Sequence, residues 1–459
     1  MAARSTKRIW ILAAVAIGLA AIAGATGCTA TAHVSPGWRA VTSPIAEVSN
    51  GCPGQNSEIE QAVDPGRGYV YEEWIGCDNH IGFAVSLDGG LHFGKPMVLA
   101  NSANSWDPSV AVAPNGTVYV GFMKATSTHM FPVVEASFDH GQTFPQVTDV
   151  VPATVGNWGD RDFLAVGPTG TAYLTWDYGP SAREIKLVCA KVGSCSFSAG
   201  DLNIVSQTST DGGKSWGPIV HVSPGFPASG GDAAPLLVTP SGRVYAEYQG
   251  YNITNATKLT LGTAHSFVTS SADGGTTWSA PVRVGPAQPT MNDSEWWIDG
   301  SISSDAAGNL FATWDTQSGG ADIGWISYSA DQGQRWSAPQ RVTPITDQAT
   351  HIVEVVGGQS GVAYVGWLTN DAVAGYALYV RPFSIRTGWL SRSVKVSNAF
   401  GNPFIWPGDT FGLSTLPPLS TGPRAHWQRV IVSWGSAVGG ATARAQDRAA
   451  VVSFQQPSN

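Results

Sequence analysis

The chain has 459 residues, of which 43% are apolar and only 13% are charged. Globular proteins carry about 25% charged residues, so this composition excludes a solvated disordered chain, a coiled coil and a long charged helical array. The formal charge of −8 argues against a nucleic-acid partner, because neutralising phosphates requires clustered Lys and Arg. The 54 Gly and 18 Trp residues, together with few charges, favour many short strands joined by tight turns.

The N-terminus has the features of an export signal. Three basic residues within the first eight precede an apolar run over 9–23, which is too short to span a membrane comfortably. The next stretch, Gly-Ala-Thr-Gly-Cys28, resembles the lipobox of bacterial lipoproteins, with Cys28 as the lipidated residue; the alternative is an ordinary cleaved signal peptide. We predict a leader over 1–27 and a linker over 28–36. The chain is then exported, and lies at the outer face of the bacterial cell membrane or is secreted, with a lipid anchor as its only membrane contact.

The other four cysteines are an even number in a chain predicted to be exported, which indicates disulfides. Pairing of sequence neighbours, Cys52 with Cys77 and Cys189 with Cys195, is the simplest of the three connectivities. The sequence has neither a Cys-x-x-Cys motif nor a Cys/His cluster, so no zinc site is predicted.

A turn motif, Ser-x-Asp-x-Gly-x-x-Trp/Phe, recurs along the chain. Its five copies begin at Ser86, Ser137, Ser209, Ser271 and Ser329. In such a turn the Asp accepts hydrogen bonds from backbone N–H groups, the Gly supplies a positive φ, and the aromatic ring covers the turn. We therefore predict a structural role for these Asp residues, not a catalytic or metal-binding one.

A second signature precedes each turn motif and consists of two strands around a Gly turn, the second strand ending near an aromatic residue. Seven copies are present, and their aromatic residues are Trp74, Phe122, Trp176, Tyr248, Trp314, Trp367 and Trp434. The sixth turn motif is shortened to 384–389. The seventh is split between the last residues of the chain and Gly37-Trp38, and the segment 43–49 resembles the strand that follows the other copies.

These repeats predict an all-β protein with a single domain, a seven-bladed β-propeller over residues 37–459. The N-terminal strand would pair as the outermost strand of the last blade and close the ring, which removes exposed sheet edges. A six-bladed ring is the alternative, with the sixth or seventh strand pair lying outside it.

The five turn motifs are Asp boxes, and with the repeated strand pairs they resemble the sialidase superfamily, also called BNR-repeat proteins, over nearly the whole mature chain. The resemblance implies a β-propeller that acts on glycans. Sialidases bind the carboxylate of sialic acid with three Arg residues and use a Tyr–Glu nucleophile pair and an Asp acid/base. The first of those Arg residues lies in a Phe/Tyr-Arg-Ile-Pro motif that this sequence lacks. No catalytic residue is therefore carried over from the family.

Candidate functional residues lie just before or at the start of the innermost strands, which converge on one mouth of the central channel. Most blades supply carboxylates there, including Glu58, Glu60, Asp232, Glu354 and Asp409. The candidate catalytic carboxylates are Asp107, Asp160, Asp162, Glu295 and Asp299. The candidate substrate-binding residues are Arg161, which could hold an anion or orient its neighbours, and Trp106, Trp158, Trp296, Trp297 and Trp406.

Trp faces stack on sugar rings, and carboxylates bind hydroxyl groups or act as acid and base, so this combination favours a glycan site. The structural alternative is that the Asp residues cap strand starts or bind a Ca²⁺ ion in the channel, while the Trp rings pack between blades. No cofactor other than that ion is expected.

The sequence thus leads to two functional hypotheses for a monomer. The first is an exported glycoside hydrolase that acts on a neutral or weakly anionic glycan through paired carboxylates, with a true exo-sialidase as a subset. The second is a non-catalytic lipoprotein propeller that binds glycan or a protein partner. A lyase acting on a uronic-acid polysaccharide is a further possibility, for which only His351 and Arg161 are suitable at the mouth.

Overall fold

The computed structural model of the chain describes residues 38–126, 130–151, 158–179, 187–191, 194–197, 203–224, 229–232, 234–255, 260–285, 300–318, 321–343, 350–371, 375–397, 401–402, 405, 407–438 and 443–455. All regular structure within these ranges is β-strand. No helix that is long and apolar enough to cross a membrane is found among these residues.

The strands of these ranges form seven antiparallel sheets of four or five strands, which are the blades. Blade 1 contains β3 (Ser57–Val63), β4 (Val70–Gly76), β5 (His80–Ser86) and β6 (Met97–Val98). Blade 2 contains β7 (Ser105–Val112), β8 (Val118–Ala125), β9 (Met130–Ser137) and β10 (Gln146–Asp149). Blade 3 contains β11 (Trp158–Val166), β12 (Ala172–Gly179), β15 (Asn203–Ser209) and β16 (Val220–His221). A separate hairpin, β13 (Leu187–Lys191) and β14 (Ser194–Phe197), lies between β12 and β15 in the chain.

The remaining blades repeat this order. Blade 4 contains β17 (Ser229–Asp232), β18 (Leu236–Val238), β19 (Val244–Asn255), β20 (Thr260–Ser271) and β21 (Val282–Arg283). Blade 5 contains β22 (Ser301–Ser304), β23 (Leu310–Ser318), β24 (Ala321–Ser329) and β25 (Gln340–Arg341). Blade 6 contains β26 (Thr350–Gly357), β27 (Val362–Asp371), β28 (Gly375–Ser384), β29 (Gly388–Trp389) and β30 (Val394–Lys395). Blade 7 contains β31 (Gly412–Leu416), β32 (Gln428–Ser436) and β33 (Gln446–Gln455), and adds β1 (Arg39–Thr42) and β2 (Ala46–Glu47).

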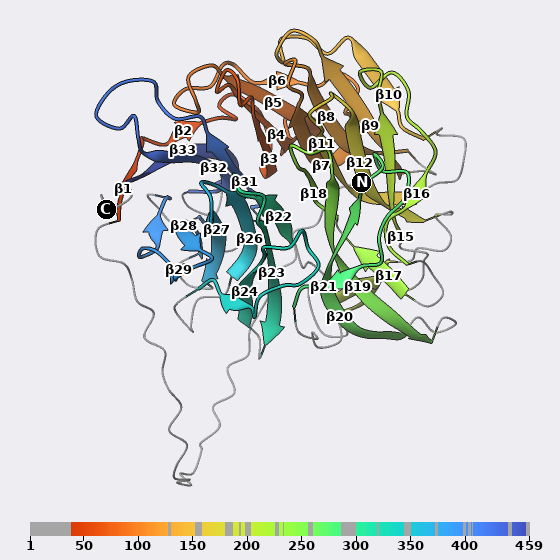
Figure 1. Cartoon of the computed structure of the whole chain (residues 1–459). Coiled ribbons are helices and arrows are strands. Elements are labelled where there is room, and N and C mark those ends of the chain that lie inside the picture. The colour runs from red at the N-terminus through yellow and green to blue at the C-terminus, as the bar shows by residue number, and fades with distance from the viewer. Residues whose placement is uncertain are drawn as a thin grey trace, which may run out of the picture.

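The blades form one closed ring. Their innermost strands contact one another in sequence order, and β31 of blade 7 contacts β3 of blade 1. Figure 1 shows the closure, where the red β1 lies beside the blue β33. Arg39 pairs with Gln455 in this sheet, and Ala46 pairs with Ala449. The predicted seven-bladed propeller and its closure by the N-terminal strand are therefore confirmed, and the six-bladed alternative is wrong because both disputed strand pairs lie inside the ring.

The core of the ring lies between the blades. The seven aromatic residues of the strand-pair signature lie on the second strand of each blade, and all are at most 3% exposed. Burying a ring of this size removes about 150–250 Å² from water, so one such residue per blade gives each interface a large apolar anchor.

The five Asp boxes are turns held by their own side chains. In each box the Ser Oγ donates to the Asp Oδ1 at 2.7–2.9 Å, and the Gly N–H donates to the Ser Oγ at 2.8–3.0 Å. Hydrogen bonds from Ser215 and Thr277 to the carboxylates lower the pKa of Asp211 and of Asp273 to about 2. Every acceptor of these carboxylates is engaged locally or faces solvent, which agrees with the predicted structural role.

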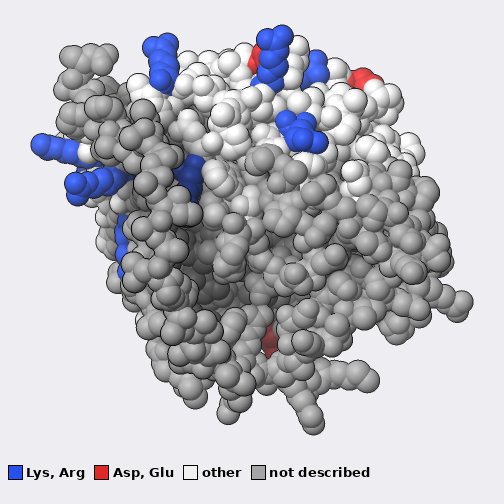
Figure 2. All heavy atoms as spheres, turned by 90° about the horizontal axis from the view of Figure 1, so that it is seen from below, with Lys and Arg blue, Asp and Glu red and all other residues white. Residues whose placement is uncertain are grey.

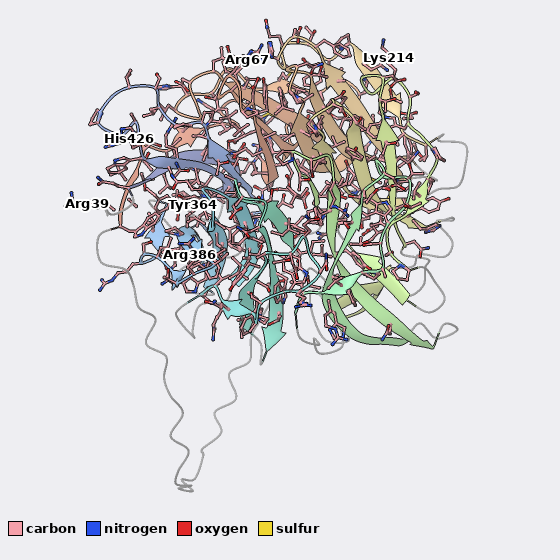
Figure 3. The ribbon with its side chains drawn as sticks, viewed as in Figure 1. Arg39, Arg67, Lys214, Tyr364, Arg386 and His426 are labelled. Carbon is pink, nitrogen blue, oxygen red and sulfur yellow. A yellow bond between two sulfur atoms is a disulfide. The ribbon has the colours of Figure 1, made fainter. Side chains whose placement is uncertain are left out.

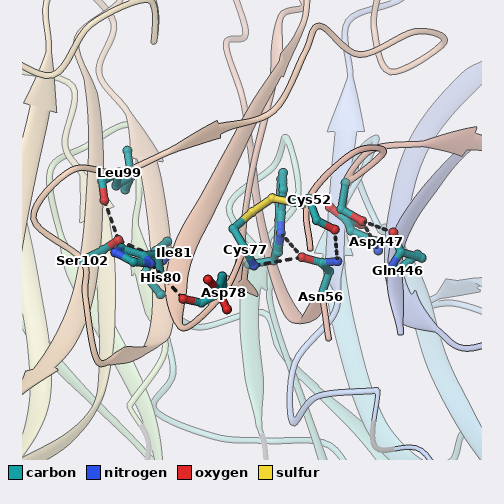
Figure 4. Close-up of a disulfide and its surroundings, with 12 residues drawn as sticks. Cys52, Asn56, Cys77, Asp78, His80, Ile81, Leu99, Ser102, Gln446 and Asp447 are labelled. Carbon is teal, nitrogen blue, oxygen red and sulfur yellow. Dashed lines mark hydrogen bonds between the residues drawn. A yellow bond between two sulfur atoms is a disulfide. The ribbon is translucent and has the colours of Figure 1, made fainter. Parts of the chain in front are cut away.

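A disulfide joins Cys52 and Cys77, as predicted, beside the seam between blades 7 and 1. Asn56 fills the space below it: its amide donates to the Cys52 carbonyl, and its Oδ1 accepts from the Trp74 indole at 3.0 Å (Figure 4). The bond therefore links the segment that follows the closing strands to the end of β4.

The second predicted pair lies in the β13–β14 hairpin, where Cys189 and Cys195 are directly opposite each other in the strand register. This register is compatible with a cross-strand disulfide, and the bond itself stays a prediction. Cys28, the predicted lipidation site, lies outside the described residues.

Candidate functional site

One mouth of the channel contains a pocket of about 270 Å³, counted with its opening to solvent. It is lined by residues at the start of the innermost strands of blades 1, 2 and 3 and by the segment that leads into β31 of blade 7. The lining residues are Glu58, Glu60, Asp107, Pro108, Arg161, Asp162, Phe163, Asp409 and Thr410. Three of the predicted site residues, Asp107, Arg161 and Asp162, are thus brought together.

The same backbone irregularity, a β-bulge, occurs in three blades at the residues that carry these side chains. A β-bulge interrupts the pairing of β3, β7 and β11 with their neighbours, at Glu58, Asp107 and Arg161 respectively. These residues have φ values of 57°, 50° and 49°, in the left-handed region that non-glycine residues adopt rarely. Such strain persists only where the surroundings enforce it, and it concentrates at functional sites.

Two of the bulges turn a backbone N–H group towards the preceding blade. The Glu58 N–H donates to the Pro407 carbonyl at 3.1 Å, and the Arg161 N–H donates to Asp107 Oδ2 at 3.1 Å. A side chain links the same two segments, because Thr410 Oγ1, before β31, donates to the Ile59 carbonyl on β3 at 3.2 Å. The four segments therefore hold one another in register around the pocket.

Arg161 is the cation of this cluster and is 6% exposed. Its Nη2 lies 3.1 Å from Asp409 Oδ2, so its guanidinium reaches from blade 3 to the segment before blade 7. Sequence reasoning placed Asp409 at the mouth but did not identify it as the partner of Arg161. The sequence repeat predicts where each residue lies within its own blade. It does not predict which side chains from different blades contact each other across the channel.

Asp162 is the most deeply buried acid in the lining, with 1% exposure. Neither of its carboxyl oxygens accepts a hydrogen bond from another described residue. The carboxyl lies over Gly121 on β8, where a Cβ atom would be 2.5 Å from Asp162 Oδ2, so the absence of a side chain makes room for it. Burial, then the charges of Asp107 and Glu60, raises the pKa of Asp162 well above its usual value and so favours its protonated form.

Asp107 has a different environment. Burial raises the pKa of its carboxyl, but a hydrogen bond with Asp160 and the charge of Arg161 oppose that rise. Because a carboxylate that accepts a hydrogen bond beside a cation is stabilised in its charged form, the Arg161 N–H and guanidinium favour the anion of Asp107. The two acids therefore differ in environment, since Asp162 accepts no hydrogen bond from another described residue whereas Asp107 accepts one from the Arg161 N–H.

Further buried carboxyl groups stand behind the lining. Glu73 on β4 is directly opposite Glu60 in the strand register and is fully buried. Burial, then the charges of Asp162, Glu135 and Glu60, raises the pKa of Glu73 well above its usual value. Sequence reasoning missed Glu73, although two adjacent Glu residues in a strand whose neighbours are all apolar or aromatic are a signal that could have found it.

The other predicted site residues are not assembled into this pocket by the described part of the structure. Asp160 adjoins it through its contact with Asp107. Trp106 is partly buried and packs against the hydrophobic core of blades 1 to 3. Trp158 begins β11, and Glu354 and His351 lie on β26. Glu295, Trp296, Trp297, Asp299 and Trp406 lie outside the described residues, and their predicted roles stay predictions.

No family model and no curated protein matches the sequence. Among solved structures, a protein of unknown function from Dyadobacter fermentans is 14% identical, with 92% of this chain and 100% of that chain covered and a TM-score of 0.54. The NanB sialidase of Streptococcus pneumoniae is 10% identical, with 83% of each chain covered and a TM-score of 0.48. The Arb93A α-L-arabinofuranosidase of Fusarium graminearum is 11% identical, with 89% and 97% covered and a TM-score of 0.49.

At these identities the likeness concerns the fold alone. The seven-sheet ring and the five Asp boxes, with their shared hydrogen-bond pattern, agree with the resemblance drawn from the sequence. The chain is a seven-bladed β-propeller built from Asp-box repeats.

Proposed function

We propose that this protein is a glycoside hydrolase whose site is the Asp107–Asp162 pocket. The observation that carries the proposal is the presence of two acids with opposed environments in one lining. Asp162 is buried without a hydrogen-bond partner from another described residue, and Asp107 accepts the Arg161 N–H and lies beside the charge of Arg161. Pairs of acids whose environments differ in this way are how enzymes divide the roles of proton donor and base at one pH.

In this mechanism Asp162 donates its proton to the glycosidic oxygen as the bond from that oxygen to the anomeric carbon breaks. Asp107, as the anion, either activates a water molecule by taking its proton or attacks the anomeric carbon directly before water releases the sugar. Asp160 and the Arg161 N–H hold the Asp107 carboxylate in place, and Asp409 fixes the Arg161 side chain.

The first test replaces Asp162 with Asn, an isosteric neutral group. The rate of hydrolysis of natural oligosaccharides should fall by about 10²–10⁴-fold, the usual contribution of a general acid, while the melting temperature stays close to that of the wild type. An activated 4-nitrophenyl glycoside should lose far less rate, because its leaving group needs no proton. Asp107→Asn should lose both activities, since the base is needed for either substrate.

Two further variants control this test. Asp149→Asn removes an exposed carboxylate at the end of β10 and should retain full activity. Gly121→Ala should displace the Asp162 carboxyl without removing it and so reduce turnover. A glycan panel that the wild type binds but never hydrolyses would instead favour the binding-only propeller, and equal losses of both substrates in Asp162→Asn would contradict the role of proton donor.

We also propose that the protein is exported, with residues 1–27 as the leader and Cys28 as the lipidated residue. The Cys52–Cys77 disulfide supports this, because such bonds persist in oxidising compartments outside the cytosol. In a bacterial host the full chain should partition with the membrane fraction, and Cys28→Ser should move it to the soluble exported fraction. Recovery of both proteins in the cytosol would contradict the proposal.

A further inference from the structure

The lining of the pocket is strongly unbalanced in charge. Among the described residues it contains five carboxyl groups, those of Glu58, Glu60, Asp107, Asp162 and Asp409, and one cation, Arg161. Even with Asp162 protonated, the carboxylates outnumber the guanidinium. Low-dielectric walls strengthen the field of such a cluster, so the pocket attracts cations and repels anions.

Arg161 is not positioned as an anion receptor. Its Nη2 already lies 3.1 Å from Asp409, and its backbone N–H is used by Asp107. A ligand carboxylate that binds Nη2 would have to displace Asp409, and in this pocket it would enter among the remaining acids. This arrangement disfavours sialic and uronic acids, although the fold resembles that of sialidases.

Several other cations of the described residues lie at the periphery of the molecule. Arg39, Arg67, Lys214 and Arg386 are exposed and lie along the outer edge of the molecule (Figure 3). Figure 2 shows Lys and Arg side chains at the edges of the face seen from below, and an acidic side chain recessed among residues drawn in grey. None of these four labelled residues lines the pocket.

Asp162 provides an independent indication of a ligand. A side chain that is 1% exposed, lines the pocket and accepts no hydrogen bond from another described residue is costly unless a bound group contacts it. As a neutral carboxyl group it has one O–H donor and a carbonyl acceptor, which suits a ligand that brings hydroxyl groups.

We propose that the pocket takes a glycan unit carrying a free ammonium group, that is, an unacetylated amino sugar. This deepens the proposed function and rests on the same pocket. The hydroxyl groups of the sugar would satisfy the neutral acid, and the ammonium would lie among the carboxylates that face Arg161. A metal ion fits the described residues less well, because no group of three or more His, Cys, Asp or Glu side chains among them converges closely enough to hold one.

The experiment is a calorimetric titration at about pH 6 with three probes of equal length. They are a tetramer of β-1,4-linked glucosamine, its fully N-acetylated counterpart and a tetramer of galacturonic acid. The glucosamine tetramer should bind at least about tenfold more tightly than the acetylated one, and high salt should reduce the difference. The galacturonic acid tetramer should show no binding. Equal affinity for the acetylated tetramer, or any preference for the acidic one, would overturn the proposal.

Two variants test whether the preference for the glucosamine tetramer arises in the pocket. Glu60→Gln should weaken binding of the glucosamine tetramer about tenfold and leave the acetylated tetramer unchanged. Asp149→Asn removes the same charge from an exposed position on β10 and should change neither affinity. If the two variants behave alike, the preference arises from net charge and not from the pocket. Displacement of the tetramer by micromolar CaCl₂ would assign the acids to a metal instead.

Hydrolysis of each tetramer is followed in parallel, which separates this proposal from the preceding one. Tight binding of the glucosamine tetramer without hydrolysis of any glycan would retain the ligand class and reject the hydrolase. Hydrolysis of the acetylated tetramer with no preference for the free amine would retain the hydrolase and reject the ligand class.

Discussion

Gly408→Ala is expected to lower the free energy of unfolding by about 3–5 kcal/mol and to abolish ligand binding at the mouth. Gly408 has φ of +113°, which L-residues rarely adopt. A Cβ atom there would lie 2.1 Å from the Glu58 backbone nitrogen and 2.4 Å from its Cα. Both are backbone atoms of a strained bulge, so neither can move aside cheaply.

The displacement would reach the site directly. Pro407, just before the glycine, accepts the Glu58 N–H, and Asp409, just after it, pairs with Arg161. Pushing this segment away from β3 breaks both contacts and leaves Arg161 buried beside fewer carboxylates. Removing one partner of a buried ion pair is strongly destabilising because the other charge stays desolvated.

Gly422→Ala is the matched control for this substitution. Gly422 has a similar φ of +96°, but no atom lies within 4 Å of the position its Cβ would take. It should therefore show only the conformational cost, about 1–2 kcal/mol, with binding unchanged. Urea unfolding of both variants measures the difference. Equal losses of stability, or unaltered ligand binding in Gly408→Ala, would show that the contact with Glu58 does not constrain the mouth.

The ring could be predicted from the sequence because its determinants are local and repeated. Each Asp box is closed by hydrogen bonds within five residues, as between Ser137, Asp139 and Gly141, so one turn explains all five copies. The closure could be predicted for the same reason, since the N-terminal segment resembles the strand that follows the other boxes. Neither inference needed a contact between distant residues.

The site could be predicted only in part. That Asp107 and Asp162 share a mouth follows from their position at the start of innermost strands. The positive φ of Glu58 and Arg161 could not be foreseen, because Glu and Arg do not indicate a left-handed conformation. For Trp106 the sequence predicted a role that the structure does not support. Its position beside a carboxylate suggested that it stacks on a sugar, but the ring packs against the core.

The seam that closes the ring contains a second buried acid pair, which predicts how stability changes with pH. Glu72 on β4 and Asp447 on β33 are both fully buried, and Asp447 can be seen beside the disulfide in Figure 4. Burial raises the pKa of Glu72 to about 8, although hydrogen bonds from Gln61, Asp447 and Ser433 oppose the rise. Burial and the charge of Glu72 raise the pKa of Asp447 well above its usual value.

Both groups bind protons more tightly in the folded protein than in the unfolded chain. Their contribution to stability is therefore complete below about pH 4 and is lost as the pH rises towards 8 and beyond. For Glu72 alone the loss between pH 4.5 and 8 is on the order of 3–5 kcal/mol. The free energy of unfolding should fall over this range, which urea titrations at pH 5, 6, 7 and 8 would measure.

Glu72→Gln should remove a large part of that slope. The amide oxygen of Gln can still accept from Gln61, which donates to Glu72 Oε1 at 2.9 Å, and its N–H₂ can donate to Asp447. The variant should thus be more stable than the wild type at pH 8 and should lose this advantage at pH 5. Glu47→Gln changes an exposed side chain on β2, in the same blade as Asp447, and should keep the wild-type slope. If the free energy of unfolding falls equally with pH in Glu72→Gln and the wild type, the Glu72–Asp447 pair does not cause the loss of stability. Other buried acids with a raised pKa, such as Glu73 and Glu247, would then be its source.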